Sequence, residues 1–575
     1  MMKNNSIAEI FERIANILEF QGEIPFKVNA YRKASRVIQD LQEDIEILWQ
    51  QGKLRELPGI GEALVKKIDE YIRTGKVSKY EEISRHVPPE LMRLLAIQNL
   101  GPKTLALAHR ELKVNNLQDL LQVIEDGRFA QLPGMGQKKA ENIQRGIKFF
   151  LSAQERIPLG TALPVVEDII QLLHEKTTMA EISPAGSLRR MKETVGDIDI
   201  LVGTNNPAKI IKEFIALPQV NDIIAAGETK ASIHLEQGYQ VDLRVVFPDS
   251  FGAALQYFTG SQAHNIKLRG LAKKQSLKIN EYGIFRDDFK IAGAIEEDIY
   301  HAIGLDWIPP EMREDRGEIE LAAEKKLPLL ITLQDVQGDL HVHSTYSDGH
   351  ASIQVMVDHA REMGYQYLAI CDHSWSARYA QGLSIEQLLR QAEEIDELNR
   401  KSNDFKILKS IEVDILTDGS LDFPDEVLAR LDLVVAAIHS NFTRNPTERI
   451  VKAMQNPLVD IIAHPTGRLI SRREGYEVDL NKIFEQARKS GTALEINCHP
   501  ERLDLSDVHA KKAAEMGILL ALNTDAHSPD NLSLIKYGIG TARRAWLSKN
   551  HILNCMSYQQ IMHWKKQRLS KNRNG

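Results

Sequence analysis

Histidines and carboxylates gather in the C-terminal half of this 575-residue chain, where twelve of the 18 histidines follow residue 330. Nine ligand-type residues lie at the ends of predicted strands or just beyond them: His341, His343, Asp348, His373, Glu412, His439, His464, Asp525 and His527. Imidazole and carboxylate ligands together favour Zn²⁺, Mn²⁺ or Fe²⁺ over Mg²⁺ alone. Nine ligands exceed the needs of one ion, so they predict two or three ions that activate a bridging water. The expected substrate is a phosphate ester.

Three aspartates near the middle of the chain predict a second metal site. Asp197 and Asp199 alternate along one strand and therefore share a face, while Asp242 comes from another strand. Three carboxylates repel one another unless cations lie between them, so we expect two Mg²⁺ ions that act on an in-line phosphoryl transfer. Gly186 and Ser187 offer close backbone approach and a hydroxyl to a triphosphate. The combined spacing is typical of nucleotidyltransferases.

Glycine-containing turns recur between helices in the first 150 residues. The sequences Leu-Pro-Gly-Ile-Gly at 57–61 and Leu-Pro-Gly-Met-Gly at 132–136 form an internal repeat, and Leu-Gly-Pro-Lys at 100–103 is a related turn. Such turns leave backbone N–H groups unpaired at the start of the next helix, where they suit a phosphate oxygen. The pattern indicates helix-hairpin-helix motifs, which hold a DNA backbone without reading its sequence. The glycines concerned are Gly59, Gly61, Gly101, Gly134 and Gly136.

The overall composition is that of a multidomain globular protein. Hydrophobic residues make up 43% of the chain and charged residues 26%, which argues against general disorder. The net charge is −7, but residues 1–160 carry 24 basic and 21 acidic residues, so a DNA-binding face is compatible with the total. Three cysteines cannot build a disulfide framework. With no signal-peptide core and no apolar run of membrane-spanning length, we expect a cytoplasmic protein.

Three kinds of element pattern must position these residues. Residues 1–155 show helical periodicity throughout, and residues 156–305 mix helices with strands at 197–202 and 240–247. A charged, helix-like stretch at 311–326 lies in an expected linker or strap between domains. From 338 onward, apolar strands alternate with helices such as 385–400, which predicts a parallel barrel of seven βα units. The predicted strands are 339–343, 367–371, 406–413, 431–438, 459–463, 493–497 and 518–523.

The first 310 residues resemble the family-X DNA polymerases. The resemblance rests on Tyr-Phe-Thr-Gly-Ser at 257–261, continuing to Asn-Glu-Tyr-Gly at 280–283, and on Asn-Ala-Tyr-Arg-Lys at 29–33. It implies that Asp197, Asp199 and Asp242 are the catalytic metal ligands of a polymerase palm. It further implies that the incoming triphosphate contacts Ser187, Arg190, Gly196 and Arg156. The nascent base pair and sugar would contact Tyr257, Phe258, Asn265 and Arg269.

Three other positions bear on this resemblance. Lys67 matches the family's Schiff-base lysine, which implies a lyase activity, although a phosphate contact is the alternative role. Gln262 stands where vertebrate members carry an acidic residue, and Gln240 stands where they carry arginine beside the third carboxylate. Both departures leave the metal ligands intact but affect the expected fidelity and rate.

Residues 338 to about 545 resemble the PHP (polymerase and histidinol phosphatase) family, with all nine motif positions present. The combination of both resemblances is similar to bacterial family-X polymerases that carry a C-terminal PHP domain. The predicted fold is an all-α helix-hairpin-helix region, an α+β nucleotidyltransferase palm with a thumb, and a (β/α)7 PHP barrel. The expected domains are a lyase-like domain at 1–90, fingers with two further helix-hairpin-helix motifs at 91–155, a palm at 156–250, a thumb at 251–310, a linker at 311–337 and the PHP phosphoesterase at 338–575.

This resemblance implies gap-filling DNA synthesis in base excision repair and a Mn²⁺-dependent 3′–5′ exonuclease. The implied ions are Mg²⁺ in the palm and two or three Mn²⁺ or Zn²⁺ ions in the PHP domain, and the partners are gapped or primer–template DNA and dNTPs. We expect a monomer that contacts no membrane. Alternatives are a 3′-phosphatase or abasic-site endonuclease, a gap-binding scaffold with a silent palm, and a small-molecule phosphatase. Glu495, Asn497 and Arg502 are further candidates for substrate contact.

Overall fold

The structure is a computed structural model in which residues 4–573 are described, apart from 40–44, 58, 86, 98, 155, 178–179 and 403. The chain forms two units. The first extends to Gln154 and includes residues 471–473, and the second contains the remaining residues. Among the described residues, no helix has the length and apolar character needed to cross a membrane.

The first unit contains the helical region (residues 4–154), which confirms the all-α prediction. Its helices enclose one apolar core that includes Phe11, Ile68, Leu105 and Phe129. The helices are α1 (Asn4–Phe20), α2 (Pro25–Gln39), α3 (Ile45–Gln50), α4 (Glu62–Thr74), α5 (Ser78–Ser84), α6 (Pro89–Arg93), α7 (Pro102–Leu112), α8 (Leu117–Glu125) and α9 (Gln137–Gln154).

The three turns predicted as helix-hairpin-helix motifs share one backbone geometry. Gly59, Asn99 and Gly134 each adopt a left-handed φ, between 69° and 86°. In each turn the next residue donates its N–H to the carbonyl three residues back, at 3.0–3.1 Å. A glycine follows and a helix begins, at α4, α7 and α9. Asn99 therefore replaces the first glycine in the second turn, since asparagine tolerates this conformation. Pro58 lies outside the described residues.

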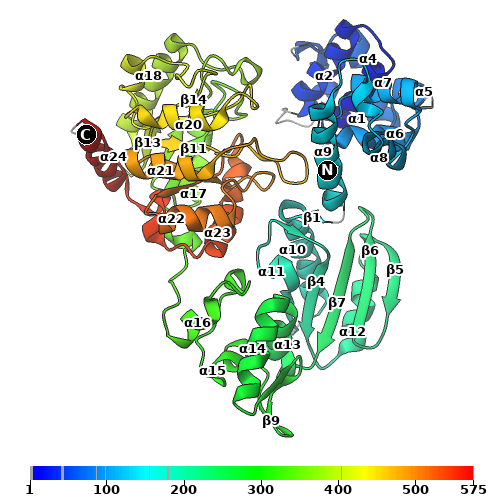
Figure 1. Ribbon diagram of the computed structural model, residues 1–575, viewed down its shortest axis with the longest axis vertical. Helices are drawn as coiled ribbons and strands as arrows, with labels where there is room; N and C mark the ends of the chain where they lie inside the picture. Colours follow the sequence, from blue (N-terminus) through cyan, green and yellow to red (C-terminus); the bar gives the residue numbers. More distant parts are fainter. Residues whose placement is uncertain are drawn as a thin grey trace. The chain divides into compact units, whose positions relative to one another are not determined.

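The sheet region (residues 156–250) contains a five-stranded mixed sheet in the order β2-β4-β7-β6-β5, and Figure 1 shows β4, β7, β6 and β5 side by side in this order. The central pair, β4 and β7, is parallel and confirms both predicted strands. The elements are β1 (Ile157–Pro158), α10 (Leu159–Lys176), β2 (Glu181–Pro184), α11 (Gly186–Arg189), β3 (Thr194–Val195), β4 (Ile198–Gly203), α12 (Pro207–Ile215), β5 (Val220–Ala226), β6 (Lys230–Leu235) and β7 (Gln240–Val246).

The connecting region (residues 251–336) packs around its own core. The segment expected as a linker contributes Met312, Ile319 and Leu330 to this core, and its helix spans only α16 (Glu318–Ala323), beginning after Gly317 at φ 103°. This part of the chain is therefore a packed strap. The other elements are α13 (Phe251–Thr259), α14 (Gln262–Lys274), β8 (Lys278–Asn280), β9 (Gly283–Arg286), β10 (Phe289–Ala292) and α15 (Glu296–His301).

The barrel (residues 338–573) closes as a ring of parallel strands, as predicted. Its two sheets are β11-β12-β13 and β14-β15-β16-β17-β18. Bridges between Val342 and Ala526 and between His373 and Glu412 join the sheets on both sides. The strands β13 and β14 together correspond to the one strand predicted at 406–413. The eight strands therefore occupy the seven predicted positions of the ring. The strands are β11 (Gly338–Val342), β12 (Tyr367–Ile370), β13 (Lys406–Lys409), β14 (Glu412–Asp414), β15 (Val435–Ala437), β16 (Ile461–Ile462), β17 (Ala493–Asn497) and β18 (Leu520–Asn523).

The helices of the barrel cover its strands through a large apolar core, which includes Met356, Ile395, Ile450 and Phe484. Their amphipathic spacing explains this cover, because each helix buries one stripe against the sheet. The helices are α17 (Ile353–Glu362), α18 (Ile385–Lys401), α19 (Asp425–Leu428), α20 (Pro446–Gln455), α21 (Leu480–Ser490), α22 (Asp507–Glu515), α23 (Ile535–Arg544) and α24 (Tyr558–Arg573).

Candidate active sites

The three aspartates of the sheet region converge at one end of the parallel pair β4–β7. Asp199 lies opposite Asp242 in the strand register, and Asp197 immediately precedes β4. One carboxylate oxygen from each residue lies within 4.8 Å of the others. This all-oxygen donor set suits hard divalent cations such as Mg²⁺, so the residues present fit the expected metal.

The electrostatics of this site also fit a cation. Burial, followed by the charges of Asp197 and Asp242, raises the pKa of Asp199 to about 7. Asp242 accepts hydrogen bonds from the Ser232 hydroxyl and from Gln240 Nε2, the latter at 3.1 Å. Neither donor neutralises its charge. A bound cation would offset the mutual repulsion that the three carboxylates create.

Gly186 is required by the close approach of α11 to the aspartates. Its φ is +59°, and an added Cβ would lie 2.2 Å from Asp199 Oδ2. A side chain at this position would therefore collide with a candidate metal ligand. Ser187 is the next residue of the same short helix.

The four expected triphosphate contacts do not all have free side chains. Arg156 lies beside Gly196, since a Cβ on that glycine would be 3.9 Å from the Arg156 guanidinium. Arg190 is instead engaged by Glu314 at 3.1 Å and by the Thr259 carbonyl. A nucleotide would have to compete with Glu314 for Arg190, or share it.

The expected contacts to base pair and sugar form one hydrogen-bonded group on α13 and α14. Asn265 Nδ2 donates to the Tyr257 carbonyl at 2.7 Å, and Arg269 Nε donates to the Asn265 carbonyl at 3.2 Å. The Tyr257 and Phe258 rings meet edge to face at 5.2 Å. The Arg244 guanidinium lies 4.6 Å from the Phe258 ring centroid. The structure brings these four predicted residues together.

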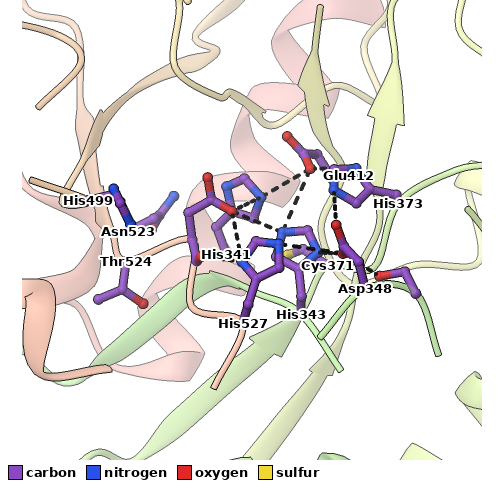
Figure 2. Close-up of polar contacts among 12 residues, drawn as sticks. His341, His343, Asp348, Cys371, His373, Glu412, His499, Asn523, Thr524 and His527 are labelled. Atoms are coloured by element: carbon purple, nitrogen blue, oxygen red, sulfur yellow. Dashed lines mark hydrogen bonds and ion pairs between the residues drawn. The ribbon is translucent and has the colours of Figure 1, made fainter. Parts of the chain in front are cut away.

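The barrel gathers all nine predicted ligands at the carboxyl ends of its strands. Figure 2 shows His341, His343, His373 and His527 directed toward a common centre with Glu412 and Asp348. The ligand atoms form three overlapping groups, each within 4.8 Å: His343, Asp348, His373 and His527; His341, His343 and Glu412; and His373, Glu412 and His439. Three groups that share members match the prediction of a multi-ion centre.

Glu412 is the shared carboxylate of this centre. It is 1% exposed, and its oxygens lie 2.9 Å from His373 Nδ1 and 3.1 Å from His439 Nε2. The two remaining predicted ligands join the same network, since His464 Nε2 lies 3.1 Å from Glu412 and Asp525 lies 3.0 Å from His343 Nε2. Both adopt a left-handed φ, which is uncommon for these residue types and frequent at functional sites.

The buried charges of the barrel centre stabilise one another. Burial opposes a charged His439, but Glu412 and Asp414 raise its pKa to about 10. Burial also opposes a charged Glu412, yet the surrounding histidines hold the pKa of this carboxyl well below its usual range. Asp348 and Asp525 raise the pKa of His527 to about 9 against the same burial.

The ring nitrogens of the centre suit metal ions. Four buried histidine nitrogens make no hydrogen bond of suitable geometry within the described residues: His341 Nε2, His343 Nδ1, His373 Nδ1 and His464 Nδ1. The first three lie 2.9–3.8 Å from carboxylate oxygens of the same centre, as groups that share a cation would. A buried polar atom without a partner is costly unless something binds it. Mixed nitrogen and carboxylate donors fit Mn²⁺, Zn²⁺ or Fe²⁺.

Models of known families match four parts of the chain. The DNA polymerase beta thumb matches residues 254–314, and the PHP domain matches residues 339–499. A helix-hairpin-helix domain matches residues 2–77, and a SAM-like helix-hairpin-helix tandem matches residues 91–148. The DNA polymerase/3′-5′ exonuclease PolX of Bacillus subtilis (strain 168) is 41% identical over 97% of this chain and 99% of its own length. The chain belongs to the PolX family.

Other relatives match only part of this PolX-family chain. DNA polymerase lambda of Arabidopsis thaliana is 27% identical over 54% of this chain and 62% of its own length. A probable phosphatase of Thermoanaerobacter sp. (strain X514) is 30% identical over 38% of this chain and 89% of its own length.

Several contacting residues of the PolX-family centres were missed by sequence reasoning. Asp414 Oδ1 accepts from His439 Nδ1 at 2.6 Å, and its position two residues after Glu412 was the available signal. Glu495, named only as a further candidate, lies 2.8 Å from His341 Nδ1. Glu314, the partner of Arg190, carried no signal because it lies in the strap. These residues hold predicted ligands in place.

Proposed function

We propose that the two centres of this PolX-family chain divide its two activities. The aspartates of the sheet region catalyse nucleotide addition to a primer, and the barrel centre removes nucleotides from a 3′ end. The observation that carries this proposal is the pair of separate ligand clusters on one chain, one made of carboxylates and one of histidines with carboxylates.

In the synthetic centre, Asp197, Asp199 and Asp242 would hold Mg²⁺, which stabilises charge on the transferred phosphoryl group. Gly186 leaves space for the Asp199 carboxylate, and Ser187 would donate a hydrogen bond to the triphosphate of a dNTP. Arg156, Arg190 and Gly196 complete that contact. Tyr257, Phe258, Asn265 and Arg269 position the base pair and sugar.

In the nuclease centre, the nine barrel ligands would hold two or three Mn²⁺ or Zn²⁺ ions, which supply a hydroxide for phosphodiester cleavage. Glu495 and Asp414 hydrogen-bond the outer nitrogens of His341 and His439 and so fix which ring nitrogen faces the ions. Asn497 donates to Asp525 at 3.0 Å and holds that ligand.

The DNA contacts in the proposal come from the helical region. The turns at Gly59 and Gly61, at Gly101, and at Gly134 and Gly136 precede helix starts, whose N–H groups suit backbone phosphates. Short-gap filling in base excision repair follows from this combination of modules. A monomeric state belongs to the same proposal. A cytoplasmic location does too, and the three unpaired cysteines support it because free cysteines are typical of a reducing compartment.

The test uses a 5′-labelled primer on a one-nucleotide gapped duplex, with Mg²⁺ or Mn²⁺ and with or without dNTPs. Extension should be lost only in Asp197→Ala with Asp199→Ala, and shortening only in His341→Ala with His343→Ala. The exposed residues Asp222 and His563 supply matched alanine controls. Wild-type shortening without extension would contradict the synthetic role and favour a scaffold or a nuclease. A 3′-phosphate primer tests the end-cleaning alternative in the same gel.

A lyase role for Lys67 rests on one observation: burial lowers the pKa of its amine. The ammonium also donates to the Ala63 carbonyl at 3.1 Å. A lowered pKa favours the neutral amine that Schiff-base chemistry requires. Borohydride should trap wild-type protein, but not Lys67→Met, on a 5′-deoxyribose phosphate end. Equal trapping of both proteins would contradict this role.

A further inference from the structure

A cavity of about 490 Å³ lies between the sheet region and the barrel, outside both metal-binding clusters. Both regions belong to the same compact unit. Their contact is apolar as well as charged, because Leu503 and Tyr537 of the barrel are part of the sheet region's core. The cavity is therefore a feature of a packed junction and has the size of a ligand pocket.

The walls of this cavity carry an excess of positive charge. Five cationic side chains and two carboxylates line it, which leaves a formal charge of +3: Arg156, Lys192, Arg316, Arg468 and Arg544 against Glu193 and Asp507. Two of the cations come from the sheet region, two from the barrel and one from the strap. A concave surface with one sign of charge concentrates ions of the opposite sign.

The two carboxylates form ion pairs only with the cations of the strap and the barrel. Asp507 binds Arg316 at 3.1 Å and Arg544 at 2.8 Å, and Glu193 binds Arg468 at 2.8 Å. Arg544 also pairs at 3.0 Å with Glu314, which does not line the cavity. Arg156 donates to the Thr194 hydroxyl and carbonyl instead of to a carboxylate. Lys192 has no ion pair with any described residue.

Lys192 is a lining cation of the cavity that has no anionic partner among the described residues. Its backbone N–H is fixed by the Ser187 carbonyl at 3.1 Å, so its position follows from the turn after α11. Burial and then the nearby charge of Arg544 lower the pKa of its amine, although the carboxylates of Glu314 and Asp507 act in the opposite direction. A half-buried ammonium beside other cations is unfavourable without an anion.

We propose that this cavity binds a phosphate-bearing anion, with Lys192 as its central contact. The ligand chemistry is that of linked phosphates, supplied by a free diphosphate or triphosphate or by successive phosphates of a DNA strand. Clustered guanidinium and ammonium groups recognise such anions through charge-assisted hydrogen bonds. Among the cations that line the cavity, Arg156 is the one that is also an expected nucleotide contact. Arg468 and Arg544 belong to the barrel, so the barrel would contribute directly to phosphate binding beside the polymerase centre.

Binding is measured in EDTA, so it depends on neither catalytic activity. Calorimetry with inorganic pyrophosphate compares wild type with Lys192→Met, Lys192→Arg and Lys536→Met. Lys536 is the matched control, since it pairs with Glu167 across the same junction at 3.0 Å but does not line the cavity. Lys192→Met should weaken binding about tenfold or more, as expected for loss of one charge-assisted contact, while the other two variants stay close to wild type.

A second arm measures a labelled single-stranded oligonucleotide as a function of salt. Loss of one phosphate contact should lower the salt slope by about 0.7 in Lys192→Met alone. Weakened pyrophosphate binding identifies free phosphates as the ligand, and a change with DNA only identifies the strand. If Lys192→Met binds both probes as wild type does, the proposal is overturned.

A third measurement needs no variant and guards against misfolding. Wild-type protein is acetylated briefly with and without pyrophosphate or oligonucleotide, and modification is read by mass spectrometry. The bound anion should protect Lys192 several-fold and leave Lys536 unprotected. Equal modification of Lys192 in all samples would contradict the site.

Discussion

The two candidate metal-binding clusters of this chain differ in how their charges are balanced. In the sheet region, three carboxylates of one sign lie together, with Asp197 exposed and Asp199 and Asp242 partly buried. In the barrel, Glu412 and His341 are almost fully buried, and histidines alternate with carboxylates. The first cluster remains repulsive without cations, whereas the second already pairs opposite charges.

This difference indicates how each centre is assembled. The barrel ligands are held by buried neighbours such as Glu495 and Asp414, so their geometry exists before metal binds. In the proposed function, the aspartates need cations and a nucleotide to complete their site. We therefore expect substitutions in the barrel to act through geometry, and substitutions among the aspartates to act through charge.

The largest effect is expected for Glu412→Gln, which keeps the shape of the shared ligand but removes its charge. Exonuclease activity should fall about 1000-fold or more, equivalent to about 4 kcal/mol of transition-state stabilisation. Polymerase activity should stay within about twofold because the aspartates are untouched. Both rates are measured on the gapped duplex, with the exposed Glu426→Gln as control. Retained exonuclease activity would show that the Glu412 charge is not needed in the catalytic centre.

Asp199→Asn should stabilise the metal-free protein in a pH-dependent manner. The folded-state pKa of Asp199 is raised to about 7 by burial and by its two neighbours, so ionisation costs the folded state free energy. That cost is absent well below the unfolded pKa of 3.8, grows as pH rises from there and is complete above pH 7, with an upper limit of about 4 kcal/mol. Thermal unfolding in EDTA should show a larger gain for the variant at pH 8 than at pH 5. Equal gains at both values would contradict the charge repulsion.

Asp414→Asn tests whether a residue that contacts no expected ion positions a ligand. Its carboxylate holds His439 Nδ1 at 2.6 Å, so the amide should misorient that ring and reduce exonuclease activity by about 10- to 100-fold. The variant should also need more Mn²⁺ for half-maximal activity, a change that simple loss of stability does not produce. Asp418→Asn, at an exposed carboxylate, is the control. An unchanged Mn²⁺ requirement would count against positioning.

The smallest effect is expected for Gln240→Ala. Gln240 donates to Asp242 at 3.1 Å from an exposed position, so its loss should slow extension only about threefold, the range of one modest hydrogen bond. Exonuclease activity should not change. Single-nucleotide extension rates compare this variant with Gln237→Ala, an exposed neighbour. A loss above about 30-fold would mean that Gln240 contacts the substrate itself, because it exceeds the range of one such bond.

Local sequence rules predicted much of this fold. Asp197 and Asp199 are two positions apart and therefore lie near one strand end, and the order of apolar strands predicted the seven-position ring. The second helical turn was less visible, because Asn99 takes the left-handed position that glycine fills in the other two turns. The stretch at 311–337 was predicted as a linker or strap because it combines charged residues with proline. Its local sequence did not show that Arg313 is buried, where it pairs with Glu296.

The sequence by itself determined which residue types meet: carboxylates in one centre, histidines with carboxylates in the other, and glycines at the helical turns. Those features depend on residue chemistry and short spacing. Only the tertiary structure decided that Glu314 engages Arg190, that Asp414 supports His439, and that Lys192 faces a cationic cavity at the barrel. These contacts join segments that approach through packing, and packing depends on the shape of the whole chain.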